Sequence, residues 1–232
     1  DVNNQFSFGH SPYRNVEFHP NLYYTFFSHH NGKYPKNGPN NEIWKKSLMR
    51  FDDNGKTPSI VKTFNNEVFR VKIPRKNSSY IYVVEGLNSS NKFWYSKNGG
   101  ISWTNITPDC SSSNTISDIA VDDENPERVW VTYGGVQSSC KVLKSENSGS
   151  SWTNISSNKL TDFPITRAVY QRGSNGGVYV GNKTGVYYKN NNMNDWEKLG
   201  EGLPMTDIRF MFINYNLGKI RIGTKRGGFE HD

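Results

Sequence analysis

The sequence is poor in several features that would restrict its function. It has two cysteines, four methionines and no stretch that approaches the ~18 consecutive apolar residues of a membrane-spanning helix, so no membrane span is predicted. There is no CxxC motif and no Cys/His cluster, so neither a zinc site nor any other cofactor is expected. The net charge is +7, but no run of five basic residues occurs, which favours a basic soluble surface and no nucleic-acid partner.

The residues that are abundant predict a β-protein. Hydrophobic residues make up only 34% of the chain but aromatic residues 14%, a mixture typical of sheets that pack on one another. Alanine and leucine are scarce, whereas Asn, Ser and Gly are frequent. Because Asn, Ser and Gly form turns, the composition indicates many short strands.

A short phrase occurs twice in the chain. "SKNGGISW" occupies residues 96–103 and "SENSGSSW" residues 145–152, and in each Asn follows Ser by two positions, Gly by four and Trp by seven. A degenerate copy ends at Trp196, and another precedes the first phrase, in "FDDNGKTP". The copies recur every 44 to 49 residues, a period that is typical of repeat architectures.

The segments between the phrases also repeat. Each contains an alternating apolar run, a polar turn, a second run rich in Val, Ile and aromatics, a glycine and a third short run, and the phrase leads into a fourth run. Four strands per ~45 residues, with no helical periodicity, predict the antiparallel blades of a β-propeller. We expect one all-β domain, either a closed five-bladed ring or part of a larger one, with blades at about 15–64, 66–108, 115–157 and 164–200 and a partial blade at 205–230.

The phrase itself is interpreted as the turn between the third and fourth strands of a blade. Glycine permits a backbone angle that other residues resist, and Ser and Asn side chains hydrogen-bond to turn amides. The Trp is expected to pack over the turn and toward the neighbouring sheet. The structural residues predicted in this way are Ser96, Asn98, Gly100, Trp103, Ser145, Asn147, Gly149, Trp152 and Trp196.

The pattern Ser-x-Asp-x-Gly-x-x-Trp resembles the Asp-box, or BNR repeat, of sialidases, sortilin-type Vps10 domains and xyloglucanase-type propellers. Asn98 and Asn147 replace the Asp, which keeps an acceptor oxygen but removes the charge. The connecting text, such as "IAVDDENPERVWVTYGG", is similar to secreted Asp-box propellers of the Bacteroidetes type over roughly residues 66–230. This resemblance implies a secreted or cell-surface protein, with further blades or modules from the same precursor or from a partner chain.

No catalytic residue is assigned from the sequence. The Phe-Arg-Ile-Pro signature of sialidases is matched only weakly by "FRVKIP" at 69–74, and the acidic residues are scattered through turns rather than paired as an inverting glycosidase requires. The favoured interpretation is a non-enzymatic module for scaffolding, adhesion, or glycan or protein binding. The alternative is a glycoside hydrolase of the endo-glucanase or sialidase-like kind that acts on polysaccharide.

Charged residues recur at one position of the innermost strands. The third residue counted from Val68, Ile116, Ile165 and Met205 is, in turn, Arg70, Asp118, Arg167 and Asp207. This alternation is either chance placement at exposed strand ends or a belt of ion pairs between neighbouring blades near the central channel.

The two cysteines offer one further prediction. Cys110 and Cys140 lie in the Ser-rich segments "CSSSN" and "VQSSC", which we expect on the same side of one blade. If the protein is exported, the two form a disulfide.

Overall fold

The computed structural model is built from short antiparallel strands. It describes residues 15–19, 22–26, 46–52, 57–86, 91–110, 115–136, 139–160 and 162–231. These residues form five sheets, four of them with four strands and the last with three. Apart from one turn of 3-10 helix at Asn158–Leu160, the described elements are strands, so the predicted all-β class is confirmed.

Each sheet is a meander of strands that follow one another in the sequence. Sheet 1 contains β1 (Asn15–His19), β2 (Leu22–Phe26), β3 (Ser47–Asp52) and β4 (Thr57–Thr63). Sheet 2 contains β5 (Val68–Lys72), β6 (Ile81–Glu85), β7 (Lys92–Ser96) and β8 (Thr104–Asn105). Sheet 3 contains β9 (Ile116–Val121), β10 (Val129–Tyr133), β11 (Val142–Ser145) and β12 (Thr153–Asn154). Sheet 4 contains β13 (Arg167–Tyr170), β14 (Val178–Asn182), β15 (Gly185–Lys189) and β16 (Glu197–Leu199). Sheet 5 contains β17 (Ile208–Asn214), β18 (Lys219–Thr224) and β19 (Gly227–His231).

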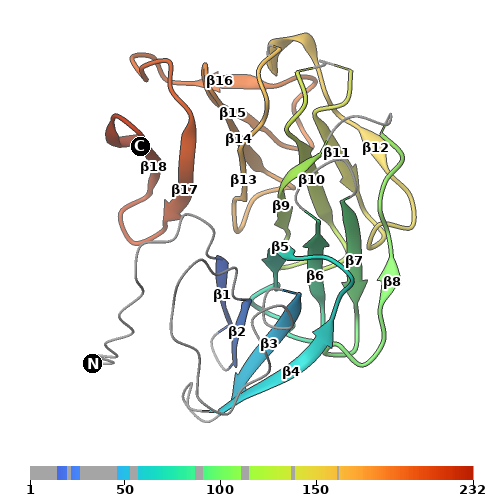
Figure 1. The fold of residues 1–232 in the computed structure, drawn as a ribbon. Helices are drawn as coiled ribbons and strands as arrows, with labels where there is room; N and C mark the ends of the chain where they lie inside the picture. Colours follow the sequence, from blue (N-terminus) through green and yellow to red (C-terminus); the bar gives the residue numbers. More distant parts are fainter. Residues whose placement is uncertain are drawn as a thin grey trace.

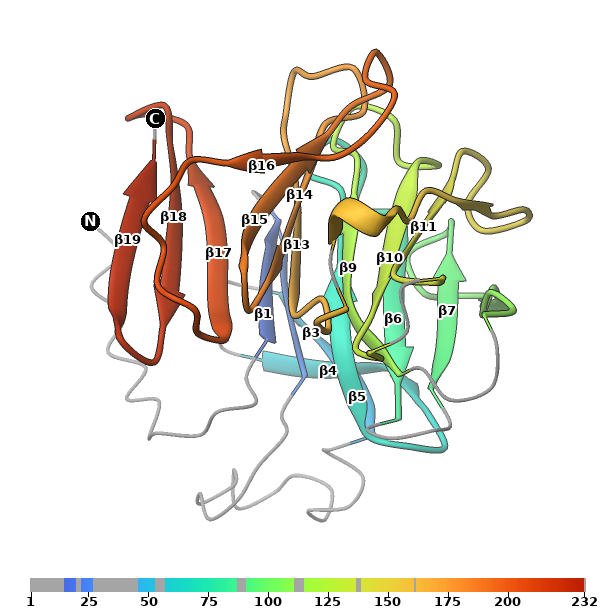
Figure 2. The same cartoon turned by 90° about the horizontal axis from the view of Figure 1, so that it is seen from above.

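The first strand of each sheet is the innermost one. β1 contacts β5, β5 contacts β9, β9 contacts β13 and β13 contacts β17, so the sheets succeed one another around a common axis (Figures 1 and 2). This radial order is that of propeller blades, and across the described strands it forms an arc that does not close into a ring.

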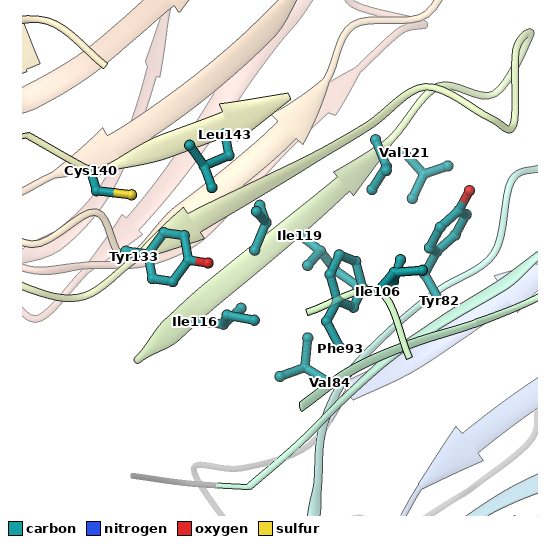
Figure 3. Packing of buried hydrophobic residues seen from close by; sticks show 12 residues of the cluster. Tyr82, Val84, Phe93, Ile106, Ile116, Ile119, Val121, Tyr133, Cys140 and Leu143 are labelled. Atoms are coloured by element: carbon teal, nitrogen blue, oxygen red, sulfur yellow. The ribbon is translucent and has the colours of Figure 1, made fainter. Parts of the chain in front are cut away.

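The core lies between successive sheets. We call the face that each sheet turns toward the next sheet in the chain its leading face, and the opposite face its trailing face. Tyr82, Val84 and Phe93 on the leading face of sheet 2 pack against Ile119 and Val121 on the trailing face of sheet 3 (Figure 3). Because both faces are covered, all five residues of β6 and all five of β10 are buried, which explains their near-continuous apolar runs.

The innermost strands of sheets 2, 3 and 5 carry an extra residue near their start. The register with the second strand shifts between Val68 and Arg70 in sheet 2, and between Ile208 and Phe210 in sheet 5. In sheet 3, Asp118 and Ile116 pair with consecutive residues of β10, so Ser117 is the extra residue. Such bulges increase local twist and turn side chains to a new direction.

Candidate functional site

The two clear phrases form nearly identical turns between the third and fourth strands. In the first, Ser96 Oγ accepts hydrogen bonds from the backbone N–H of Asn98 at 3.3 Å and of Gly100 at 2.9 Å. Asn98 Oδ1 accepts from the N–H of Ser102 at 2.9 Å, while Asn98 Nδ2 donates to Ser102 Oγ at 2.8 Å.

The second turn repeats these bonds. Ser145 Oγ accepts from Asn147 N at 3.2 Å and from Gly149 N at 2.8 Å. Asn147 bonds Ser151 through both its Oδ1 and its Nδ2, at 2.9 Å each. The Nδ2 bond is one that a carboxylate cannot make, because a carboxylate has no donor. The serine six positions after the first one, Ser102 or Ser151, was not identified from the sequence.

The glycines of these turns do more than adopt a positive φ. The φ angles of Gly100 and Gly149 are 91° and 83°. A Cβ on Gly100 would lie 2.2 Å from Cγ1 of Val61, and one on Gly149 would lie 2.7 Å from Cβ of Ile106. Val61 and Ile106 belong to the preceding sheet or directly follow its last strand, so each turn approaches that sheet too closely for any side chain at the glycine.

The tryptophans also reach backward along the chain. Trp152 Nε1 donates to the carbonyl of Ile106 at 3.2 Å, and Trp196 Nε1 donates to the carbonyl of Ile155 at 2.7 Å. Both carbonyls directly follow the fourth strand of the preceding sheet. Trp103 instead donates to the carbonyl of Gly100 in its own turn, at 2.8 Å, and packs edge-on against the ring of Phe64. The turns therefore connect each sheet to the preceding one.

Asp118, on the innermost strand of sheet 3, contacts the two neighbouring sheets. Its Oδ1 accepts from Arg70 Nε at 3.1 Å and from the N–H of Ile119 at 3.0 Å, and its Oδ2 accepts from the N–H of Ala168 at 3.1 Å. The side chains of Arg70 and Asp118 are 12% and 8% exposed, so the pair is largely shielded from water. Asp118 thereby joins sheets 2, 3 and 4.

The alternation of charges predicted an ion pair between Arg167 and Asp207, but Arg167 makes other contacts. Arg167 donates through Nε to the carbonyl of Arg209 and through Nη1 to the carbonyl of Thr166. Burial lowers the pKa of the Arg167 guanidinium, and the nearby charge of Asp118 opposes that shift. Asp207 lies exposed just before β17.

The count that selected Asp207 was wrong. β17 begins at Ile208, and because of the bulge Phe210 pairs with Gly223, just as Arg167 pairs with Gly181 in sheet 4. Met205, from which the count was made, is 57% exposed and precedes the strand. The residue equivalent to Arg70, Asp118 and Arg167 is therefore Phe210.

Cys110 and Cys140 form a disulfide with a Cα–Cα distance of 6.2 Å. Cys140 lies in the connection between β10 and β11, but Cys110 lies in the segment that leads from β8 of sheet 2 to β9 of sheet 3. The bond therefore braces a connection between two sheets as well as the end of one.

The acidic turn that joins β9 to β10 also contacts neighbouring sheets. Asp123 Oδ1 accepts from the N–H of Arg75 at 2.9 Å, and Glu124 accepts from the hydroxyl of Tyr170 at 2.7 Å. Burial raises the pKa of Asp123 and also that of Tyr170, whose pKa the bond to Glu124 raises further. These acids hold sheets 2, 3 and 4 in register, a role that the sequence did not predict for them.

Within the described ranges, no group of three or more His, Cys, Asp or Glu residues is placed to hold a metal ion. The same part of the chain contains no helix with the length and apolar character that crossing a bilayer requires.

Comparison with known proteins identifies the fold class. No protein-family model matches the sequence, and the comparison with curated proteins finds no significant match. Among solved structures, an ancestral GH74 enzyme is similar with a TM-score of 0.63 at 20% identity, over 90% of this chain and 27% of that one. The GH74 xyloglucanase from Xanthomonas campestris is similar with a TM-score of 0.64 at 14% identity, over 90% of this chain and 33% of that one. A nidogen/laminin complex contains a chain with a TM-score of 0.60 at 10% identity, over 81% of this chain and 71% of that one.

These similarities show the fold, which is that of a β-propeller. The chain spans only 27% and 33% of the two GH74 structures, so it corresponds to part of each. The same fold is present in GH74 enzymes and in a nidogen/laminin complex, so fold alone does not select an activity.

Proposed function

We propose that this chain is part of a non-enzymatic propeller module, secreted or at the cell surface, that holds a glycan or protein partner on a rigid scaffold. The observation that carries the proposal is the use made of Asp118, the shielded carboxylate near the axis. Both of its oxygens accept hydrogen bonds from neighbouring sheets, so it fixes sheets 2, 3 and 4 relative to one another.

Two other buried carboxylates also accept several hydrogen bonds, from groups in or next to their own sheets. Glu85 accepts from the N–H of Asn66 at 2.8 Å and from Trp94 Nε1 at 2.9 Å. Asp122 caps two turn amides and pairs with Arg128 at 2.9 Å. A general acid or base must instead reach a substrate proton, so these side chains support a scaffold better than a hydrolase.

The disulfide supports location outside the reducing cytosol. Bonds such as Cys110–Cys140 persist in oxidising compartments and are rare in cytosolic proteins. The similarity to the extracellular domain of a B. thetaiotaomicron one-component system, with a TM-score of 0.61 at 14% identity over 93% of this chain and 26% of that one, is consistent with such a location. One similar propeller structure is a nidogen/laminin complex, and this supports a protein as the alternative to a glycan partner.

The test compares binding with turnover. The purified chain is applied to an array of plant, microbial and sialylated glycans and, in parallel, incubated with xyloglucan and with a sialoside. We expect no release of reducing sugar or sialic acid, whether or not a glycan is retained. Release of many product molecules per protein molecule would overturn the proposal in favour of the glycoside hydrolase alternative, since one of the similar structures is a xyloglucanase.

A further inference from the structure

Among the described residues, the leading face of sheet 5 is left exposed, and two large aromatic side chains lie on it. Phe210 and Phe212, which alternate along β17, are 68% and 50% exposed. They line a hollow of about 480 Å³ together with Gly223 and Arg221 of β18 and with Gly228 and Glu230 of β19. Large exposed aromatics that gather on one face mark an interaction surface more often than isolated ones do.

The strand registers show which residues of sheet 4 occupy the positions of Phe210 and Phe212. Phe210 pairs with Gly223 as Arg167 pairs with Gly181, so Phe210 occupies the position of Arg167. Phe212 lies two residues further on the same face and so corresponds to Val169. The exposed pair therefore occupies the positions that form the inter-sheet contact elsewhere in the propeller.

Each preceding leading face is covered by the trailing face of the next sheet. Sheet 2 is covered by sheet 3, as described above. In sheet 3, Ala120 and Trp130 are buried against Ala168 and Val180 of sheet 4. In sheet 4, Val169 packs in one cluster with residues of sheet 5. In these three cases the covering surface is an aliphatic and aromatic sheet face.

The contact between sheets 4 and 5 shows how closely such faces approach. A Cβ on Gly181 would lie 3.0 Å from Cδ1 of Ile208, which opens the next sheet. The hydroxyl of Thr166 donates to the carbonyl of Ile208 at 2.9 Å. At the equivalent glycine of sheet 5, Gly223, the nearest atom is Cδ2 of Phe210, a residue of the same sheet, also at 3.0 Å.

The charged residues that share this face are paired with one another. Arg221 Nε lies 3.2 Å from Glu230 Oε2, and Lys219 Nζ lies 3.0 Å from Glu230 Oε1. Arg221 pairs directly across from Phe212, so the face presents two phenylalanines beside charges that neutralise one another, a combination of apolar and polar groups that is usual at protein interfaces.

We propose that the leading face of sheet 5 binds the aliphatic trailing face of a further antiparallel sheet of the same blade type, carried on polypeptide outside residues 1–232. The occupant follows from continuity: sheets 2, 3 and 4 each bury this face against such a sheet, and sheet 5 repeats its register. Two phenylalanines need small or β-branched partners across the contact, as Ile119 and Val121 provide for Phe93 in sheet 2.

The experiment places the photocrosslinking amino acid p-benzoylphenylalanine at Phe212 in the intact protein, in the cells that make it, and identifies the crosslinked peptides by mass spectrometry. Position 210 serves as a second site on the same face. Leu217 is the matched control, because it is 56% exposed on the same sheet but lies in the turn between β17 and β18. We expect crosslinks from 212 and 210, and not from 217, to a strand with alternating β-branched residues that lies outside residues 1–232.

The other results overturn the proposal. Crosslinks to peptides from within residues 1–232 would assign the face to the first sheet or to a second copy, and sedimentation of the purified chain would separate those two. Crosslinks to a glycan or a lipid would assign a different ligand class. Equal yields from 212 and 217, or no crosslink from either position on the face, would show that no sheet covers it.

Discussion

Replacing Asp118 tests the link between the axis and the stability of the propeller. In Asp118→Ala, the N–H of Ala168 loses its acceptor and the shielded guanidinium of Arg70 loses its counter-ion. Removing one partner of a buried ion pair costs about 3–5 kcal/mol. The loss of the acceptor for the Ala168 N–H is not added in full, because both interactions are made by the same carboxylate and their costs are not additive. We therefore expect the free energy of unfolding to fall by about 3–5 kcal/mol.

Asp118→Asn should lie between alanine and wild type. The amide keeps one acceptor oxygen but turns an NH₂ group toward a donor, either Arg70 Nε or the N–H of Ala168. One buried donor is then unsatisfied, which costs about 1–3 kcal/mol. Asp207→Asn is the matched control, because Asp207 is exposed and should change stability by less than about 0.5 kcal/mol.

The measurement is urea unfolding followed by tryptophan fluorescence, since the chain has six tryptophans. A change of midpoint at constant slope reports stability rather than altered compactness. The reasoning is refuted if Asp118→Ala and Asp207→Asn have the same free energy of unfolding. A double-mutant cycle adds a second criterion: coupling of Asp118 to Arg70 should exceed its coupling to Arg167, because Arg167 donates to the backbone carbonyls of Arg209 and Thr166.

Three further predictions concern the turns, the disulfide and a buried lysine. Gly149→Ala should cost more than Gly173→Ala in thermal unfolding, because both have positive φ but only Gly149 contacts the preceding sheet; equal losses would contradict a role for that contact. Replacing both Cys110 and Cys140 by serine should lower the free energy of unfolding by about 3 kcal/mol, and an unchanged denaturant midpoint would show that the bond does not constrain the unfolded chain. Burial lowers the pKa of Lys141 in the folded protein. At pH values between that lowered pKa and the ordinary 10.5, the unfolded chain therefore binds more protons than the folded one. Stability relative to Lys141→Met should therefore rise with pH across this window, and a flat or falling difference in unfolding free energy would disprove the shift.

The sequence by itself determined the repeat and the strand content. Alternating apolar runs and Ser/Asn/Gly turns are local signals, because the hydrogen bonds of Ser145 and Asn147 reach only residues within the same turn. A chain with this chemistry every 44 to 49 residues can bury its strands only by stacking sheets, so the propeller fold was predictable.

Only the tertiary structure decided which residues meet across sheets. The last innermost strand begins at Ile208 and not at Met205, so the position equivalent to Arg70, Asp118 and Arg167 is Phe210, which only the pairing with β18 reveals. The backward reach of Trp152, the three-sheet contact of Asp118 and the exposed face of Phe210 and Phe212 depend on the order and spacing of whole sheets. Local turn chemistry carries no information about that spacing, because contacts between residues more than 40 positions apart form only when the sheets pack.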